Sequence, residues 1–154
     1  MKEITFATMA IIFFTMVAPI RAQEASTNNA DIRVAVVGFS DTRGRCACAL
    51  YNHVEGFPTD RKQVFRNAVG KIGEDHKAVC DFKNVPTGTY AIALFHDAKL
   101  TGKMEKNLIG IPQEGYGFSN DAKPHTLSAP SFGECAFQHS ASQPTNLTIN
   151  LQHY

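Results

Sequence analysis

The sequence predicts an all-β fold, an antiparallel β-sandwich of about six or seven strands with at most one short helix and one long ordered loop. Short segments rich in β-branched and apolar residues recur along the chain, and turn-forming residues separate them. Helical periodicity occurs in one segment only, whereas an α/β fold would alternate strands with helices. These observations favour two packed antiparallel sheets.

Six segments have the composition of strands. Residues 31–39 (DIRVAVVGF) and 89–97 (TYAIALFHD) are apolar on both faces, which is typical of buried strands. Residues 146–154 (NLTINLQHY) alternate strictly and place their apolar side chains on one face. The remaining candidate strands are residues 45–52, 76–82 and 135–139.

Residues 60–69 carry the one helical pattern. Thr59 can cap this segment and Gly70 can end it. Its apolar residues fall on one side of a helix, namely Val64, Phe65, Ala68 and Val69. An irregular crossover between strands is the alternative.

The long loop begins with residues 96–120 (HDAKLTGKMEKNLIGIPQEGYGFSN), directly after the predicted strand 89–97, and extends to residue 132. Loops longer than about 12–15 residues in a compact domain are usually functional or disordered. This loop contains Ile, Pro, Tyr and Phe at intervals, which can anchor it. We therefore expect an ordered loop over residues 97–132 that covers one end or side of the sandwich.

The N-terminal residues 1–22 have the layout of a secretory signal peptide, with Lys2 before an apolar run and the small residue Ala22 at the expected cleavage site. The run is too short to span a bilayer, which needs about 20 apolar residues. We expect export to the periplasm or beyond the cell, a flexible leader over residues 23–30, and a single domain over residues 31–154.

The predicted mature chain is electrically neutral. Of the 15 basic and 14 acidic residues, Lys2, Arg21 and Glu3 lie within the signal, so 13 of each remain. A nucleic-acid binder carries a basic surface, so we expect no such partner. The six histidines lack the H-E-x-x-H spacing of a zinc site, and we expect no metal and no cofactor.

Four cysteines in an exported chain indicate two disulfides. Cys46 and Cys48 lie two residues apart on a predicted strand, where an extended backbone disfavours a bond between them. Two pairings remain: Cys46 with Cys80 and Cys48 with Cys135, or the exchanged partners. Metal binding by the thiolates of the C-A-C segment is the alternative, although its spacing is shorter than that of structural zinc sites.

Residues 85–97 (VPTGTYAIALFHD) resemble the P-x-G-x-Y turn and strand of transthyretin-like and carboxypeptidase-regulatory-like β-sandwiches, which implies a prealbumin-like fold. Residues 96–120, followed by P-S-F at residues 130–132 and A-F at residues 136–137, resemble the bacterial exported family called domain of unknown function 2141. Its usual runs are H-D-x-N-x-N-G-x-x-D-x-N, G-I-P-x-E-x-x-G-x-S-N, P-P-S-F and A-x-F. The resemblance covers the chain from Arg33 to its C-terminus and implies no established activity.

The loop departs from that family pattern at one informative position. The family loop resembles a cation-binding turn with oxygen side chains at alternate positions. Here Lys99 places an ammonium group where an oxygen ligand would lie. We therefore expect no calcium in this loop and a lysine acting as an internal cation instead.

Seven residues are the candidate binding residues of the loop: His96, Asp97, Glu114, Tyr116, Phe118, Ser119 and Asn120. Aromatic rings beside amides are typical of carbohydrate- or peptide-binding surfaces, although the rings can instead fix the loop to the sheet. Asp97 can accept backbone N–H groups at the strand end, His96 can hold loop backbone, and Glu114 can bind a lysine or loop amides.

The sequence thus predicts an exported, non-enzymatic module that binds a carbohydrate, a peptide or another envelope partner through its 97–132 loop. A small hydrolase using His96, Glu114 and Ser119 is one alternative, and it requires these side chains to converge. A structural envelope component is the other, and it predicts a flat loop surface.

Overall fold

The structure, a computed structural model, describes residues 29–126 and 128–153. The predicted signal peptide (residues 1–22) and most of the predicted leader lie outside the described residues. The described strands are β1 (Ala30–Val37), β2 (Arg45–Tyr51), β3 (Arg66–Gly70), β4 (Lys77–Val85), β5 (Gly88–Asp97), β6 (Tyr116–Phe118), β7 (Phe137–His139) and β8 (Thr145–Asn150). The short helical elements are η1 (Arg61–Gln63), η2 (Ser119–Asp121) and α1 (Phe132–Cys135).

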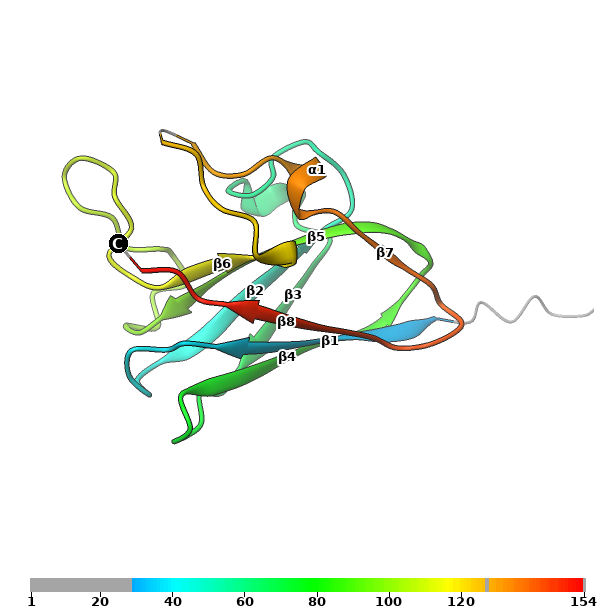
Figure 1. The fold of residues 1–154 in the computed structure, drawn as a ribbon, viewed down its shortest axis with the longest axis horizontal. Helices are drawn as coiled ribbons and strands as arrows, with labels where there is room; N and C mark the ends of the chain where they lie inside the picture. Colours follow the sequence, from blue (N-terminus) through cyan, green and yellow to red (C-terminus); the bar gives the residue numbers. More distant parts are fainter. Residues whose placement is uncertain (1–28, 127, 154) are drawn as a thin grey trace, which may run out of the picture.

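These strands form two layers, which confirms the predicted all-β sandwich (Figure 1). One sheet has the order β4-β1-β8, and the other has the order β3-β2-β5-β6, with β7 paired to the start of β5. Neighbouring strands are antiparallel except β1 and β8, which are parallel from Ile32↔Thr145 to Val37↔Asn150. The chain crosses from the other sheet before it forms β8, so this last strand runs in the same direction as β1.

The main core lies between the two sheets. Alternate residues of each strand point into it, as the period of two requires. Its buried members include Ile32, Val34, Cys48, Phe82 and Ile92. The strand β5 contributes a second set of side chains to its opposite face, so it is buried on both sides, as its apolar composition predicted.

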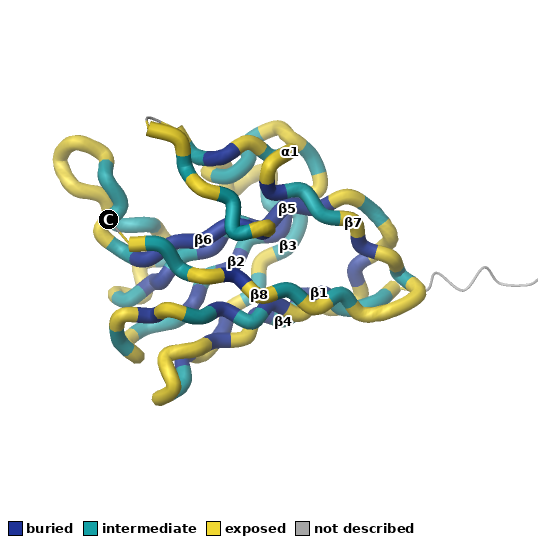
Figure 2. The backbone as a smooth tube through the Cα atoms, in the orientation of Figure 1, coloured by how far each residue is buried: buried dark blue, intermediate teal, exposed yellow. Residues whose placement is uncertain are grey.

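A second apolar cluster covers the outer face of β5. Ala91 and Phe95 supply it from the strand, and Tyr116, Phe118 and Cys135 supply it from the long loop. Figure 2 shows buried residues along β5 and β6 beneath this part of the chain. The 97–132 loop therefore folds back over one face of the sheet, which is the covering role that its composition predicted.

The predicted helix over residues 60–69 is wrong. The segment contains the short helix η1 and then the strand β3, which pairs with β2 from Cys46↔Gly70 to Leu50↔Arg66. Hydrogen bonding to β2 and burial of Phe65 override a helical pattern that spans few residues. Gly70 does not end a helix: a Cβ there would lie 2.7 Å from the carbonyl oxygen of Val79, so glycine lets β3 pass close to β4.

The strand β6 joins the loop to both sheets. It pairs with β5 from Ala93↔Phe118 to Phe95↔Tyr116. Tyr116 also exchanges two backbone hydrogen bonds with Gln152, just after β8, at N···O distances of 3.1 and 2.7 Å. Gly117 makes this close approach feasible, because a Cβ there would lie 2.8 Å from the Cγ2 atom of Ile149. A strand of three residues gives no period to detect in a sequence.

Candidate functional site

Asp97 ends β5 and organises the start of the loop. Its carboxylate is completely buried and accepts three hydrogen bonds: from the N–H of Thr101 (2.8 Å), from the N–H of Gly102 (3.0 Å) and from Nε of Arg45 (2.9 Å). The structure thus confirms the predicted carboxylate-to-amide turn and adds a partly buried ion pair across the β2–β5 register. Asp97 is a structural residue and offers no free oxygen to a ligand.

His96 lies on the opposite face of β5 from Phe95, in the register pair with Cys46. Its Nε2 lies 2.8 Å from the carbonyl oxygen of Arg43, and its ring packs edge-on against Phe39 at 5.2 Å between centroids. The side chain is buried. The His96 side chain therefore holds the backbone of the β1–β2 turn and not, as the sequence suggested, that of the 97–132 loop.

Glu114 ties two distant parts of the loop together. Its Oε1 accepts the N–H of Ala98 and its Oε2 accepts the N–H of Glu105, each at 3.1 Å. Lys99 and Lys103 were its alternative partners, and Lys99 instead pairs with Glu105 at 3.1 Å. Glu114 binds loop amides and so fixes the base of the segment between them.

That segment is a small hairpin over residues 105–113. Its two sides are joined by the bridge between Lys106 and Pro112 and by a hydrogen bond from the N–H of Gln113 to the carbonyl oxygen of Glu105 (2.8 Å). Figure 1 shows the hairpin projecting from one end of the sandwich, near the C-terminus. No residue of the 105–113 hairpin belongs to the apolar cluster on β5.

Asn107 closes the hairpin turn. Its backbone N–H bonds to the carbonyl oxygen of Ile111, and its own carbonyl oxygen accepts the N–H of Gly110. Its side-chain Oδ1 accepts the N–H groups of Ile109 (3.1 Å) and Ile111 (2.9 Å). Gly110 has φ +84°, a conformation that favours glycine. The turn therefore satisfies most of its backbone donors internally.

Leu108 and Ile109 form the tip of this turn and are the most exposed large apolar side chains of the loop. Leu108 is fully exposed, and 79% of Ile109 is exposed. The exposed tip is visible in Figure 2. Sequence reasoning missed these two residues, although N-L-I-G contains a signal: Asn and Gly at the outer positions of a turn push the residues between them into solvent.

Tyr116 and Phe118 do not form an exposed binding surface. Both side chains are buried in the cluster on the outer face of β5, and their rings lie 5.9 Å apart. Phe57 and Phe132 complete this aromatic packing at 5.7 Å from each other. The expected carbohydrate or peptide surface made by these rings is therefore wrong, and the alternative, that they fix the loop to the sheet, describes the structure.

Ser119 and Asn120 also have structural roles. The Ser119 hydroxyl oxygen accepts the N–H of Ile92 (2.9 Å), and the same hydroxyl donates to the carbonyl oxygen of Cys135. The Asn120 amide donates to the carbonyl oxygens of Glu134 and Ala136 at 3.2 and 2.9 Å. Together they connect β5 and β6 to the helix α1.

The side chains of the hydrolase alternative do not converge. His96 contacts the β1–β2 turn, and Glu114 accepts hydrogen bonds from amides of the loop. Ser119 is bonded to Ile92, which precedes His96 by four residues in β5. Four residues of extended strand span about 13 Å, which is far beyond hydrogen-bond reach. The catalytic arrangement that this alternative required is therefore not formed.

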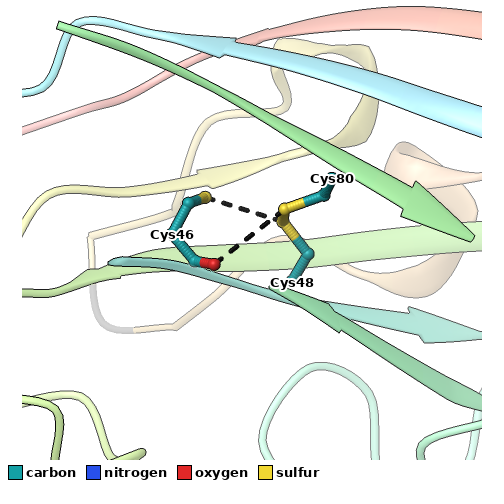
Figure 3. Close-up of side chains that lie close together, drawn as sticks. All are labelled: Cys46, Cys48 and Cys80. Carbon is teal, nitrogen blue, oxygen red and sulfur yellow. Dashed lines mark hydrogen bonds between the residues drawn. A yellow bond between two sulfur atoms is a disulfide. The ribbon is translucent and has the colours of Figure 1, made fainter. Parts of the chain in front are cut away.

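The cysteines form one disulfide, between Cys48 and Cys80, which joins the two sheets. Cys46 lies on the same face of β2, and its Sγ is 3.6 Å from Sγ of Cys48 (Figure 3). The second predicted disulfide is wrong, because Cys46 and Cys135 are both free. Cys46 belongs to the core between the sheets and Cys135 to the outer cluster, so a whole sheet separates them.

Burial governs the chemistry of the free thiols. It raises the pKa of Cys46 to about 12, and burial, with a smaller contribution from Glu134, raises that of Cys135 to about 12. Among the described residues, the one group of three side chains spaced to hold a metal is Cys46, Cys48 and Cys80. The disulfide between Cys48 and Cys80 already uses two of these three sulfur atoms, and metals bind the thiolate form of cysteine.

A shallow surface depression of about 440 Å³ lies at the other end of the sandwich from the 105–113 hairpin. Asp31 and Ser142 are among the residues that line it, and none of the seven candidate binding residues does. Asp31 is already paired with Lys83 at 2.8 Å.

A family model described as "Uncharacterized protein conserved in bacteria (DUF2141)" matches residues 34–148. The chain belongs to this family. The matched region runs from β1 into β8, so the DUF2141 domain includes both sheets, the disulfide and the whole 97–132 loop. No curated protein and no solved structure gives a significant match to the chain. Within residues 29–126 and 128–153, the DUF2141 chain has no helix long and apolar enough to cross a membrane.

Proposed function

We propose that this DUF2141 protein is an exported, non-enzymatic docking module that binds a surface of the bacterial envelope through its 105–113 hairpin. The observation that carries the proposal is the pair of exposed apolar side chains, Leu108 and Ile109, on a turn with a well-organised base. Exposed apolar groups that a fold presents rather than buries commonly mark an interaction site.

The hydrogen bonds of the loop support a rigid base that presents an exposed hairpin tip. Asp97 and Glu114 together accept four loop amides, at residues 98, 101, 102 and 105, and so fix both ends of the loop segment that leads into the hairpin. The remaining candidate residues hold the loop against β5. A rigid base lowers the ordering cost that a flexible loop would incur on binding.

Export is supported by the layout of residues 1–22. The disulfide between Cys48 and Cys80 is also typical of an oxidising compartment. A purely structural envelope component would present a flat loop surface, and the projecting hairpin departs from that expectation.

The test is co-sedimentation of the mature chain, residues 23–154, with the envelope fraction of the bacterium that produces it. The variant Leu108→Asp/Ile109→Asp is compared with the wild type and with Val54→Asp. Val54 is a matched control, because it is 65% exposed in a different loop. We expect the wild type and the control to sediment and the hairpin variant to stay in solution. Equal sedimentation of all three proteins, or of none, would refute the proposal.

A further inference from the structure

We propose that the surface bound by the 105–113 hairpin is an anionic lipid bilayer, into whose interfacial region Leu108 and Ile109 insert. This inference rests on the proposed function and names the partner of the same site. It follows from the shape of the tip, from its charges and from the state of its backbone.

The shape of the tip suits a lipid surface better than a protein surface. Leu108 and Ile109 project from a narrow two-sided hairpin and have no apolar neighbours of comparable exposure within it. Contact with a protein through this tip would bury a few hundred Å² at most, whereas each partner of a standard interface buries roughly 800 Å². A bilayer closes around a convex apolar tip from all sides, so the same two side chains can be fully removed from water.

The charges around the tip favour an anionic surface. The acidic groups of residues 97–114 are engaged internally: Asp97 with Arg45, Glu105 with Lys99, and Glu114 with backbone amides. In the described part of the chain, Lys103 and Lys106 have no acidic partner. Lys103 precedes the hairpin, and Lys106 lies within its N-terminal side, opposite Pro112. Basic residues next to an inserting apolar tip bind lipid phosphates and add to its affinity.

Most of the backbone N–H groups at the tip already have an acceptor within the turn. A peptide N–H that enters lipid without an acceptor is costly. Here the N–H groups of residues 107, 109, 110 and 111 all donate within the turn, two of them to the Asn107 side chain. An ordinary solvated loop would leave several of these donors to water and would lose those hydrogen bonds on insertion.

The Leu108→Trp variant gives a direct probe, because the chain contains no tryptophan. It is mixed with vesicles of phosphatidylcholine, with and without phosphatidylglycerol, and Val54→Trp serves as the control. We expect the emission of the hairpin indole to shift to shorter wavelength with the anionic vesicles, more weakly at high salt, and that of the control indole to stay unchanged. Adding Ile109→Asp lowers the partition coefficient by about tenfold or more. Adding Lys103→Gln/Lys106→Gln lowers it by about thirtyfold on anionic vesicles.

The outcomes separate this inference from the proposed function. If the emission does not shift with either vesicle while the wild type still sediments with envelopes through its hairpin, the partner is a protein or a cell-wall polymer, and the lipid inference is wrong. A shift of equal size at positions 108 and 54 would also refute it, because the binding would then not be localised to the hairpin. Failure of both vesicle and envelope binding overturns the inference together with the proposed function.

Discussion

Replacing Asp97 with asparagine removes the charge that organises the base of the loop and keeps the shape of the side chain. The carboxylate is completely buried and accepts three donors at 2.8–3.0 Å. An amide has one acceptor oxygen and one donor nitrogen, so at least one donor faces another donor. Breaking a buried ion pair costs about 3–5 kcal/mol. We expect about 3 kcal/mol, because Arg45, whose side chain is 36% exposed, can regain water.

The assay is thermal unfolding followed by circular dichroism. For a domain of this size, about 3 kcal/mol corresponds to a drop in Tm of about 10 °C. Asp75→Asn is the matched control, because its carboxylate is 62% exposed and lies 3.7 Å from Lys77. Exposed pairs contribute about 0–1 kcal/mol, so its Tm should hardly change. A Tm of Asp97→Asn equal to that of the control would refute the structural role assigned to this carboxylate.

Three further predictions concern the rest of the fold. Replacing Cys80 with alanine removes the disulfide to Cys48, which spans 32 residues. The free energy of unfolding measured by urea titration should fall by about 3–4 kcal/mol. Stability equal to that of the wild type would contradict the disulfide. Gly117→Ala should cost about 1–3 kcal/mol by overpacking, whereas Gly133→Ala, whose Cβ would meet nothing within 4 Å, should cost less, and equal costs would refute the packing argument. The pKa of Glu134 is lowered from 4.5 to about 2, chiefly by hydrogen bonds from Ser131. The stabilising effect of the Glu134 carboxylate should therefore be complete above about pH 5 and lost as the pH falls toward 2. Glu134→Gln should remove this part of the pH dependence of Tm, and an unchanged profile would contradict the prediction.

The strands that proved predictable are those whose residues alone determine their burial. Residues 89–97 are apolar on both faces, and the structure buries both faces of β5. The helix predicted over residues 60–69 failed because its pattern was short and its partner, β2, lies outside the segment. Periodicity is a local signal, whereas strand pairing is decided by distant residues.

The candidate site shows the same limit. The sequence correctly indicated that Asp97 would bind amides of the loop, because that interaction is local. It could not tell whether Tyr116 and Phe118 face water or the sheet, since only the folding of the loop over β5 decides this. The exposure of Leu108 and Ile109 follows from the Asn107 turn, and it was missed because large apolar residues are normally assigned to a core.

Hydrogen exchange of the mature protein, free and bound to envelope membranes, tests the central claim most directly. The account predicts that binding slows exchange at the amides of the 105–113 hairpin and leaves the amides of β5 and the opposite end of the sandwich unchanged. Slower exchange elsewhere on the sandwich, with the hairpin as fast as in the free protein, would show that the binding surface lies outside the loop and would contradict the account.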